Sequence, residues 1–124
     1  MIRKRCRSWR PPVKKALGAP QSEDYSFYHA PAFIIASNTR GYANGMADCA
    51  CAMENMMLAA HSMGLGTVWI NQLKDTCGDA GVRKLLTAFG VPEDHDVYAC
   101  CAIGTALGGA KAPDRKAGAT AIVE

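Results

Sequence analysis

The 124-residue sequence contains no apolar run long enough to cross a membrane, and no apolar stretch follows its charged N-terminus. A membrane-spanning helix needs about 20 mostly apolar residues, and a signal peptide needs an apolar region behind its basic start. We therefore expect neither a membrane partner nor secretion. Six cysteines in a chain without a secretion signal are expected to be reduced thiols, which predicts a cytoplasmic protein.

Histidine is scarce too, which limits nucleophilic catalysis. The three histidines are His29, His61 and His95, and none lies in a recognisable motif. A serine or cysteine nucleophile needs a base such as histidine beside it. The sequence therefore does not favour hydrolase chemistry, and we name no catalytic side chain.

The cysteines do not have the spacing of a metal site. Cys49 and Cys51 are two residues apart, and Cys100 and Cys101 are adjacent. Two thiolates that share a tetrahedral zinc ion usually stand in a C-x₂₋₄-C hairpin. We interpret these cysteines as buried core thiols and expect no metal.

Positive charge is concentrated at one end of the chain. Residues 1–15 hold seven basic side chains and no acidic one, leaving seven basic against eleven acidic side chains in the remainder. We interpret residues 1–27 as a basic arm or linker that is solvated. A nucleic-acid contact through this arm is the alternative that we do not expect, and the salt dependence of DNA retention would test it.

The apolar pattern after the arm predicts one α+β domain. Short apolar runs at 32–37, 66–70 and 97–104 predict buried strands, and the 3.6-residue period at 44–64 and 79–90 predicts helices. A last strand is possible at 119–123. The predicted order is therefore strand, helix, strand, helix, strand.

The helix predicted at 44–64 has an unusually wide apolar arc. Asn44 can cap its start and Gly64 suits its end. The apolar arc exceeds half of the circumference, so we expect a central, largely buried helix. The arc is also too wide for a chain of this size to cover alone, which predicts a homodimer. Asp48, Asn55 and Ser62 form a polar line that we interpret as structural, a site being the alternative.

Gly-Leu-Gly at 64–66 stands where a helix turns into a strand. Glycine-rich phosphate loops have the opposite order, from strand to helix. These glycines therefore indicate a tight turn and do not indicate a dinucleotide-binding βαβ unit.

Several blocks of the sequence together resemble a known family. "YHAPAFIIAS", "MADCACAMENMMLAAHSMGLGTVWINQL", "VRKLLTAFGVPEDHDVYACCAIG" and "APDRK" are similar, in order and spacing, to the C-terminal part of the nitroreductase family, the FMN-dependent NAD(P)H oxidoreductases. The resemblance covers roughly residues 28–116. It implies an α+β, nitroreductase-like fold with a mixed β-sheet flanked by helices, within a domain of residues 28–124.

The resemblance also implies a cofactor site and an activity. The central helix would run along a dimer interface. The strip Trp69, Ile70, Asn71 and Gln72 would lie against the flavin ring, largely through backbone groups, and Arg115 and Lys116 would bind the FMN phosphate. The implied reaction passes a hydride from NAD(P)H through FMN to a nitroaromatic, a quinone or a similar acceptor. The sequence leaves open the acceptor and the choice between NADH and NADPH.

Two N-terminal motifs of this family are absent from their expected places. The family usually begins with Arg-Arg-Ser-x-Arg, followed by Ala-Pro-Ser…Asn…Gln-Pro-Trp. Here Arg7–Arg10 and Ala19–Pro20 resemble fragments of them but stand too close together. We interpret both as coincidental and expect a domain truncated in its N-terminal third. Whether the chain is an enzyme therefore stays open. The alternative is a flavin-free homologue that acts only as a dimerising or partner-binding module.

Overall fold

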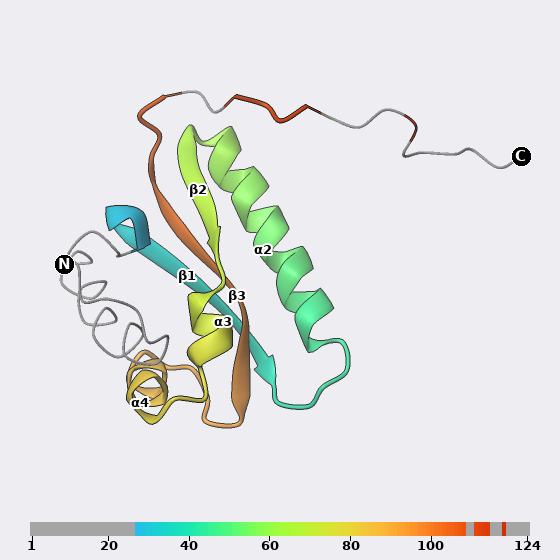
Figure 1. Cartoon of the computed structure of the whole chain (residues 1–124), viewed down its shortest axis with the longest axis vertical. Coiled ribbons are helices and arrows are strands. Elements are labelled where there is room, and N and C mark those ends of the chain that lie inside the picture. The colour runs from blue at the N-terminus through green and yellow to red at the C-terminus, as the bar shows by residue number, and fades with distance from the viewer. Residues whose placement is uncertain (1–26, 109–110, 115–117, 119–124) are drawn as a thin grey trace, which may run out of the picture.

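The computed structural model describes residues 27–108, 111–114 and 118 (Figure 1). The basic arm, apart from its last residue, and the possible strand at 119–123 lie outside these residues. The elements in chain order are a 3₁₀ turn η1 (Phe27–His29), β1 (Ala32–Thr39), α2 (Gly45–Ser62), β2 (Leu65–Ile70), α3 (Gln72–Thr76), α4 (Ala80–Ala88) and β3 (His95–Thr105).

The three described strands form one sheet in the order β1-β3-β2, with β3 in the middle. β3 pairs antiparallel with both neighbours, from Ala32↔Ile103 along β1 and from Leu65↔Thr105 along β2. Helix α2 carries the chain across the sheet from β1 to β2, and the last strand then enters between them. The outer strands are parallel to each other but do not touch. The expectation of a mixed sheet is therefore wrong for the described strands, because the only neighbouring pairs are antiparallel.

Helix α2 lies along one face of the sheet (Figure 1). Its buried residues Cys49 and Met53 pack with Ala99 and Cys101 of β3, and we name this group the α2-side core. Asn44 stands at the N-cap, but its side chain makes no capping hydrogen bond, contrary to the sequence expectation. Gly64 follows the helix with φ +74°, a left-handed conformation that glycine adopts without strain.

The expectation that α2 is largely buried is wrong for the single chain. Met46, Leu58 and Met63 are 56%, 58% and 74% exposed, respectively. A sheet of three described strands covers only one stripe of a helix that lies across it. The rest of the apolar arc, which the sequence pattern identified, therefore faces outward.

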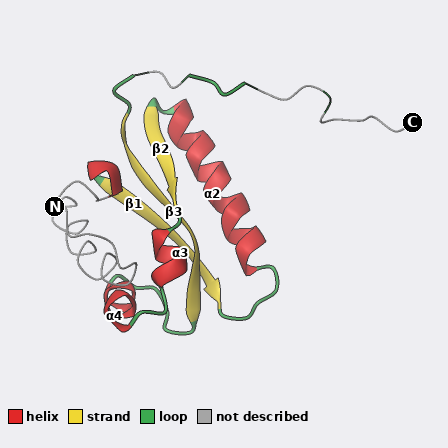
Figure 2. Ribbon diagram, in the orientation of Figure 1, coloured by secondary structure: helices red, strands yellow, loops and turns green. Residues whose placement is uncertain are grey.

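The opposite face of the sheet carries α3 and α4 (Figure 2). Its core consists of Ile70, Leu73, Cys77, Val82, Leu86, Val97, Cys100 and Ala102. The helix predicted at 79–90 is present as α4, and the Asp79 carboxylate caps it by accepting hydrogen bonds from the backbone N–H of Gly81 and Val82 at 2.9 and 3.2 Å. α3 was not predicted. In the described part of the chain, every helix is too short or too polar to reach across a lipid bilayer.

The side chain of Leu86 gives a test of this second layer, because it is completely buried under the sheet. We expect Leu86→Ala to lower the free energy of unfolding by about 2–5 kcal/mol through lost burial and a residual cavity. Thr87→Ala, one position along the same helix and exposed, should change it by less than about 0.5 kcal/mol. Urea denaturation followed by circular dichroism measures both. Equal stabilities would mean that α4 does not pack on the sheet.

Candidate functional site

The predicted cofactor strip, residues 69–72, lies where β2 ends and α3 begins. Ile70 is 2% exposed and belongs to the core beneath α3 and α4, so its side chain cannot reach a ligand. Trp69 is half-buried and packs on the α2-side core. Asn71 is exposed and stands at the N-cap position of α3. The four residues are consecutive in the chain, and Trp69 and Ile70 point to opposite faces of the sheet, so their backbone is the part that they can present together.

Two side chains of the strip are joined by a hydrogen bond. The indole Nε1–H of Trp69 donates to Oδ1 of Asn71 at 2.8 Å. Residues two apart at the end of a strand point to the same face, which makes this contact possible. Asn71 makes no capping hydrogen bond to α3. Its amide is therefore held by the indole.

The donors on this strip suit the pyrimidine edge of a flavin ring. In the described sheet β2 has β3 as its only neighbour, so alternate backbone N–H and C=O groups along β2 face away from the sheet. The pyrimidine ring carries carbonyl oxygens and ring nitrogens, which accept or exchange hydrogen bonds with such groups. The residues present therefore fit this part of FMN. Arg115 and Lys116, predicted to bind the phosphate, lie outside the described residues.

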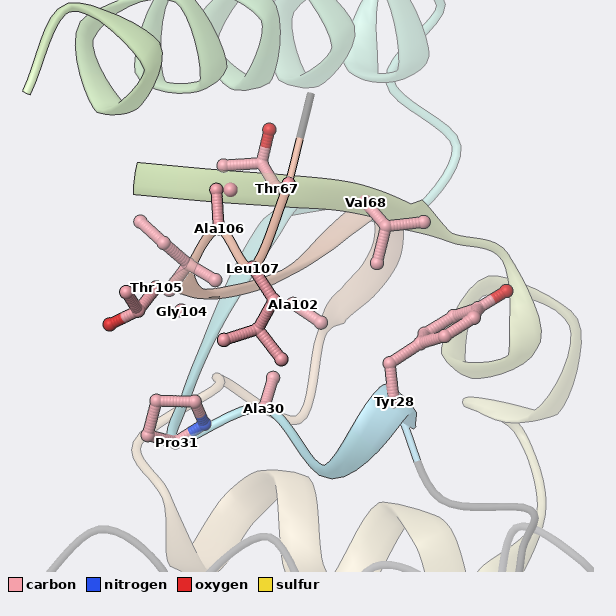
Figure 3. A pocket seen from close by; sticks show the side chains of 13 residues that line it. Tyr28, Ala30, Pro31, Thr67, Val68, Ala102, Gly104, Thr105, Ala106 and Leu107 are labelled. Atoms are coloured by element: carbon pink, nitrogen blue, oxygen red, sulfur yellow. The ribbon is translucent and has the colours of Figure 1, made fainter. Parts of the chain in front are cut away.

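A hollow of about 510 Å³ opens at the other end of β2 (Figure 3). Its walls come from the segment around Tyr28, from the start of β2 and from the end of β3 with the residues that follow it. None of its described lining residues is charged. It does not include residues 69–72. This hollow and the predicted strip are thus different places, and the described lining of the hollow supplies no charged side chain to a phosphate.

Two small residues shape this hollow. A Cβ atom added to Gly104 would lie 2.9 Å from Cδ of Pro31, and one added to Gly66 would lie 3.4 Å from Ala106. Tyr28, at its rim, has φ 55° and is 73% exposed. The segment before β1 therefore approaches β3 so closely that no side chain fits at position 104.

The structure shows one serine–histidine pair that sequence reasoning missed. Ser37 Oγ and His95 Nδ1 lie 3.1 Å apart, within hydrogen-bond distance. They come from opposite ends of the described chain and meet only through the β1–β3 register, so no local motif could reveal them. In the described residues no carboxylate contacts His95, and the neighbouring Asp96 instead accepts from Arg40 Nε at 3.1 Å. The pair therefore lacks the orienting acid that a hydrolytic triad uses.

The described cysteines are all free thiols. Cys49, Cys77, Cys100 and Cys101 are buried, and Cys51 is exposed on α2. Burial raises the pKa of the Cys49, Cys100 and Cys101 thiols, which keeps them protonated near neutral pH. The described residues bring together no group of three or more His, Cys, Asp or Glu side chains that could hold a metal ion.

Comparison with known proteins places this geometry in context. The sequence model of the Nitroreductase family matches residues 7–105. Two archaeal relatives, provisionally named NADH dehydrogenase/NAD(P)H nitroreductase, come from Methanothermobacter thermautotrophicus and Archaeoglobus fulgidus. They are 46% identical over 48 residues and 35% identical over 57 residues, which are 37% and 46% of this chain. The matched segments span only 22% and 31% of the length of these relatives.

Solved structures cover more of the chain. A nitroreductase with bound FMN from Bacteroides fragilis is 42% identical, covers 99% of this chain and 70% of its own, and has a TM-score of 0.82. A nitroreductase with bound FMN from Desulfitobacterium hafniense, 16% identical, has a TM-score of 0.81 over 98% of this chain and 71% of its own. The predicted α+β, nitroreductase-like fold is confirmed. The division into an arm of residues 1–27 and a domain of residues 28–124 stays a prediction.

The close approach at Gly104 can be tested by one methyl group. We expect Gly104→Ala to destabilise the fold by about 1–3 kcal/mol, because the new Cβ would overlap the rigid ring of Pro31. Gly78→Ala is the matched control, since a Cβ there meets nothing within 4 Å. The melting temperatures of the two variants measure the difference. If both variants melt like the parent, then Pro31 and β3 are not in the contact described above.

Proposed function

The chain belongs to the nitroreductase family, and on that premise we propose that it is an FMN-dependent oxidoreductase. The proposed reaction passes a hydride from NAD(P)H through FMN to a nitroaromatic, a quinone or a similar small acceptor. The observation that carries the proposal is the 42% identity, over 99% of the chain, to a nitroreductase with bound FMN. The names of the archaeal relatives, which mention NADH dehydrogenase and NAD(P)H nitroreductase, support the same choice of donor.

In this proposal the chain binds and orients, and FMN, when bound, supplies the ring that accepts and returns the hydride. Residues 69–72 would hold the pyrimidine edge through the outward backbone groups of β2 and the turn into α3. Fixed N–H groups can stabilise negative charge that develops on a ring without reorganisation. No serine, cysteine or histidine needs to act as a nucleophile.

Arg115 and Lys116 are proposed to hold the phosphate group of FMN. They directly follow Asp114, the last residue of the described segment 111–114. A guanidinium and an ammonium group both make charge-assisted hydrogen bonds to phosphate oxygens, and the guanidinium can do so through two N–H groups. The described lining of the hollow carries no such charge, so it offers no competing cation for the phosphate.

We further propose that the protein is a homodimer that pairs through α2. Met46 and Leu58 on this helix, and Met63 directly after it, are large apolar side chains that the single chain leaves exposed. Burying them against a second copy removes apolar surface from water, which is the main favourable term in such association. The free thiols of the described cysteines favour a reducing compartment, and we propose the cytoplasm.

A flavin-free dimerising module is the second candidate function. The exposed apolar side chains of α2 would serve it equally well, and it needs nothing from residues 69–72 or from Arg115 and Lys116. Flavin binding separates the two functions, because a module that only dimerises has no reason to bind FMN.

The cofactor site is tested by titrating FMN with the purified chain and following flavin fluorescence, with NAD(P)H oxidation by a quinone or nitroaromatic measured in parallel. We expect saturable FMN binding and acceptor-dependent oxidation. Replacing both cations, Arg115→Ala with Lys116→Ala, should weaken FMN binding at least tenfold, a loss of about 1.4 kcal/mol. Lys111→Ala, a nearby exposed cation, is the control and should bind like the parent. Unchanged affinity in the double variant would remove these residues from the site, and absence of FMN binding by the parent would favour the module.

The dimer is tested by one charge at Leu58, an exposed apolar side chain of α2. Leu58→Glu should convert a dimer into a monomer in light scattering at micromolar concentration, because it places a carboxylate in the proposed apolar contact. Cys51 lies seven residues earlier, on nearly the same line of the helix, so thiol labelling at Cys51 should become faster in this variant. Thr87→Glu on α4 is the control and should leave the parent's mass unchanged. A parent that is already a stable monomer would contradict the proposal.

A further inference from the structure

The side chain of Asn71 does not cap α3, although Asn71 stands at the N-cap position of that helix. Asparagine at an N-cap normally accepts a hydrogen bond from a backbone N–H in the first turn of the helix, which stabilises the helix. Here the Asn71 side chain makes no such bond. Its Oδ1 accepts instead from the indole of Trp69 at 2.8 Å. A local stabilising contact is thereby given up for one that orients the amide.

The indole also determines which end of the amide faces outward. A tryptophan Nε1–H can only donate, so the atom of Asn71 that meets it must be the carbonyl oxygen Oδ1. The indole therefore distinguishes the oxygen of this amide from its nitrogen. The Nδ2 group, with its two donors, is therefore at the other end. Within the described residues it meets no protein acceptor.

Trp69 is itself held firmly, which makes it a useful positioning group. Its ring packs on the α2-side core, where Met53 is fully buried and Cys101 is 1% exposed. A half-buried ring wedged between a strand and a helix has few rotamers available. The direction of its N–H, and with it the direction of the Asn71 amide, is therefore set by the packing of α2 on the sheet.

We propose that the Nδ2 group of Asn71 donates a hydrogen bond to a ring carbonyl of the flavin, and that Trp69 is the positioning residue that aims it. This inference rests on the proposed function and adds a side-chain contact to the backbone contacts proposed above. The ligand chemistry that it selects is a planar heterocycle with a carbonyl oxygen at its edge. A carboxylate in place of the amide would meet that oxygen with like partial charge.

The competing interpretation is purely structural: the bond would only tie the turn between β2 and α3. In that case Asn71 and Trp69 would affect folding stability and leave FMN affinity alone. The two interpretations are separated by measuring FMN affinity and melting temperature on the same variants, and by observing the Asn71 side-chain amide directly.

The test uses the full chain, FMN as the probe, and fluorescence titration. Removing one neutral hydrogen bond in Asn71→Ala should weaken FMN binding about fivefold. Asn71→Asp, which replaces the donor with a charged acceptor, should weaken it at least tenfold. Trp69→Phe keeps an aromatic side chain but removes the indole N–H that holds the amide. Its FMN affinity should lie between those of the parent and Asn71→Ala. Asn44→Asp makes the same chemical change at an exposed helix start and should bind FMN like the parent.

Nuclear magnetic resonance separates the two interpretations, because a purely structural role of Asn71 would leave its side-chain amide signals unchanged when FMN is added. The Nδ2 proton signals of Asn71, identified by their loss in Asn71→Asp, should shift as FMN is added, and the Asn44 signals should not. FMN binding by the parent with unshifted Asn71 signals and equal affinity in Asn71→Ala would overturn this inference and leave the proposed function standing. An affinity loss that merely tracks the loss of folded protein would also overturn it. If the parent binds no FMN, the proposed function and the inference fall together.

Discussion

Strand β3 pairs along both of its edges, and the position of every other described element follows from that pairing. It is the last strand in the chain and the middle strand of the sheet. β1 and β2 run parallel on either side of it and are connected in the chain through α2. Its residues Val97, Ala99, Cys100 and Cys101 are at most 1% exposed, so both faces of this strand are covered. The antiparallel ladders on its two sides fix the distance between the outer strands, and with it the width of the surface on which α2 lies.

A single irregularity in this ladder sets which side chains face which layer. The β1–β3 register shifts between Ala36 and Ser37, opposite Tyr98. Tyr98 and Ala99 therefore both pack toward α2, although they are neighbours in a strand. Beyond the bulge the normal alternation returns, with Cys100 in the core beneath α3 and α4 and Cys101 toward α2. The ring of Tyr98 comes so close to the start of α2 that a Cβ added at Gly45 would lie 2.9 Å from it.

The sequence predicted which helices and strands form better than it predicted which of them lie next to one another. The three strands and the two longer helices were predictable because buried strands and amphipathic helices have apolar patterns of their own. The antiparallel neighbours were not, since the place of β3 is a long-range property that no local pattern records. α3 was missed because its five residues, QLKDT, are too few to show a helical period. The burial of α2 was overestimated because the width of an apolar arc shows what can be buried, and not which surface buries it.

The candidate site shows the same limit. The resemblance predicted residues 69–72 as a strip, and its assignment to FMN, like that of Arg115 and Lys116, stays a prediction. The spacing of Trp69 and Asn71 puts both side chains on one face of a strand, so their contact could have been anticipated. That Asn71 stands at a helix start could not, because α3 itself was not predicted. Its unused capping role becomes visible only when strand, turn and helix are seen together. An amide held by a half-buried indole has a defined direction before any ligand arrives, so a ligand that uses it does not have to order that side chain. Preorganisation of this kind is what separates a binding group from a merely exposed one, and here it depends on the packing of α2 against β3, the same contact that organises the fold.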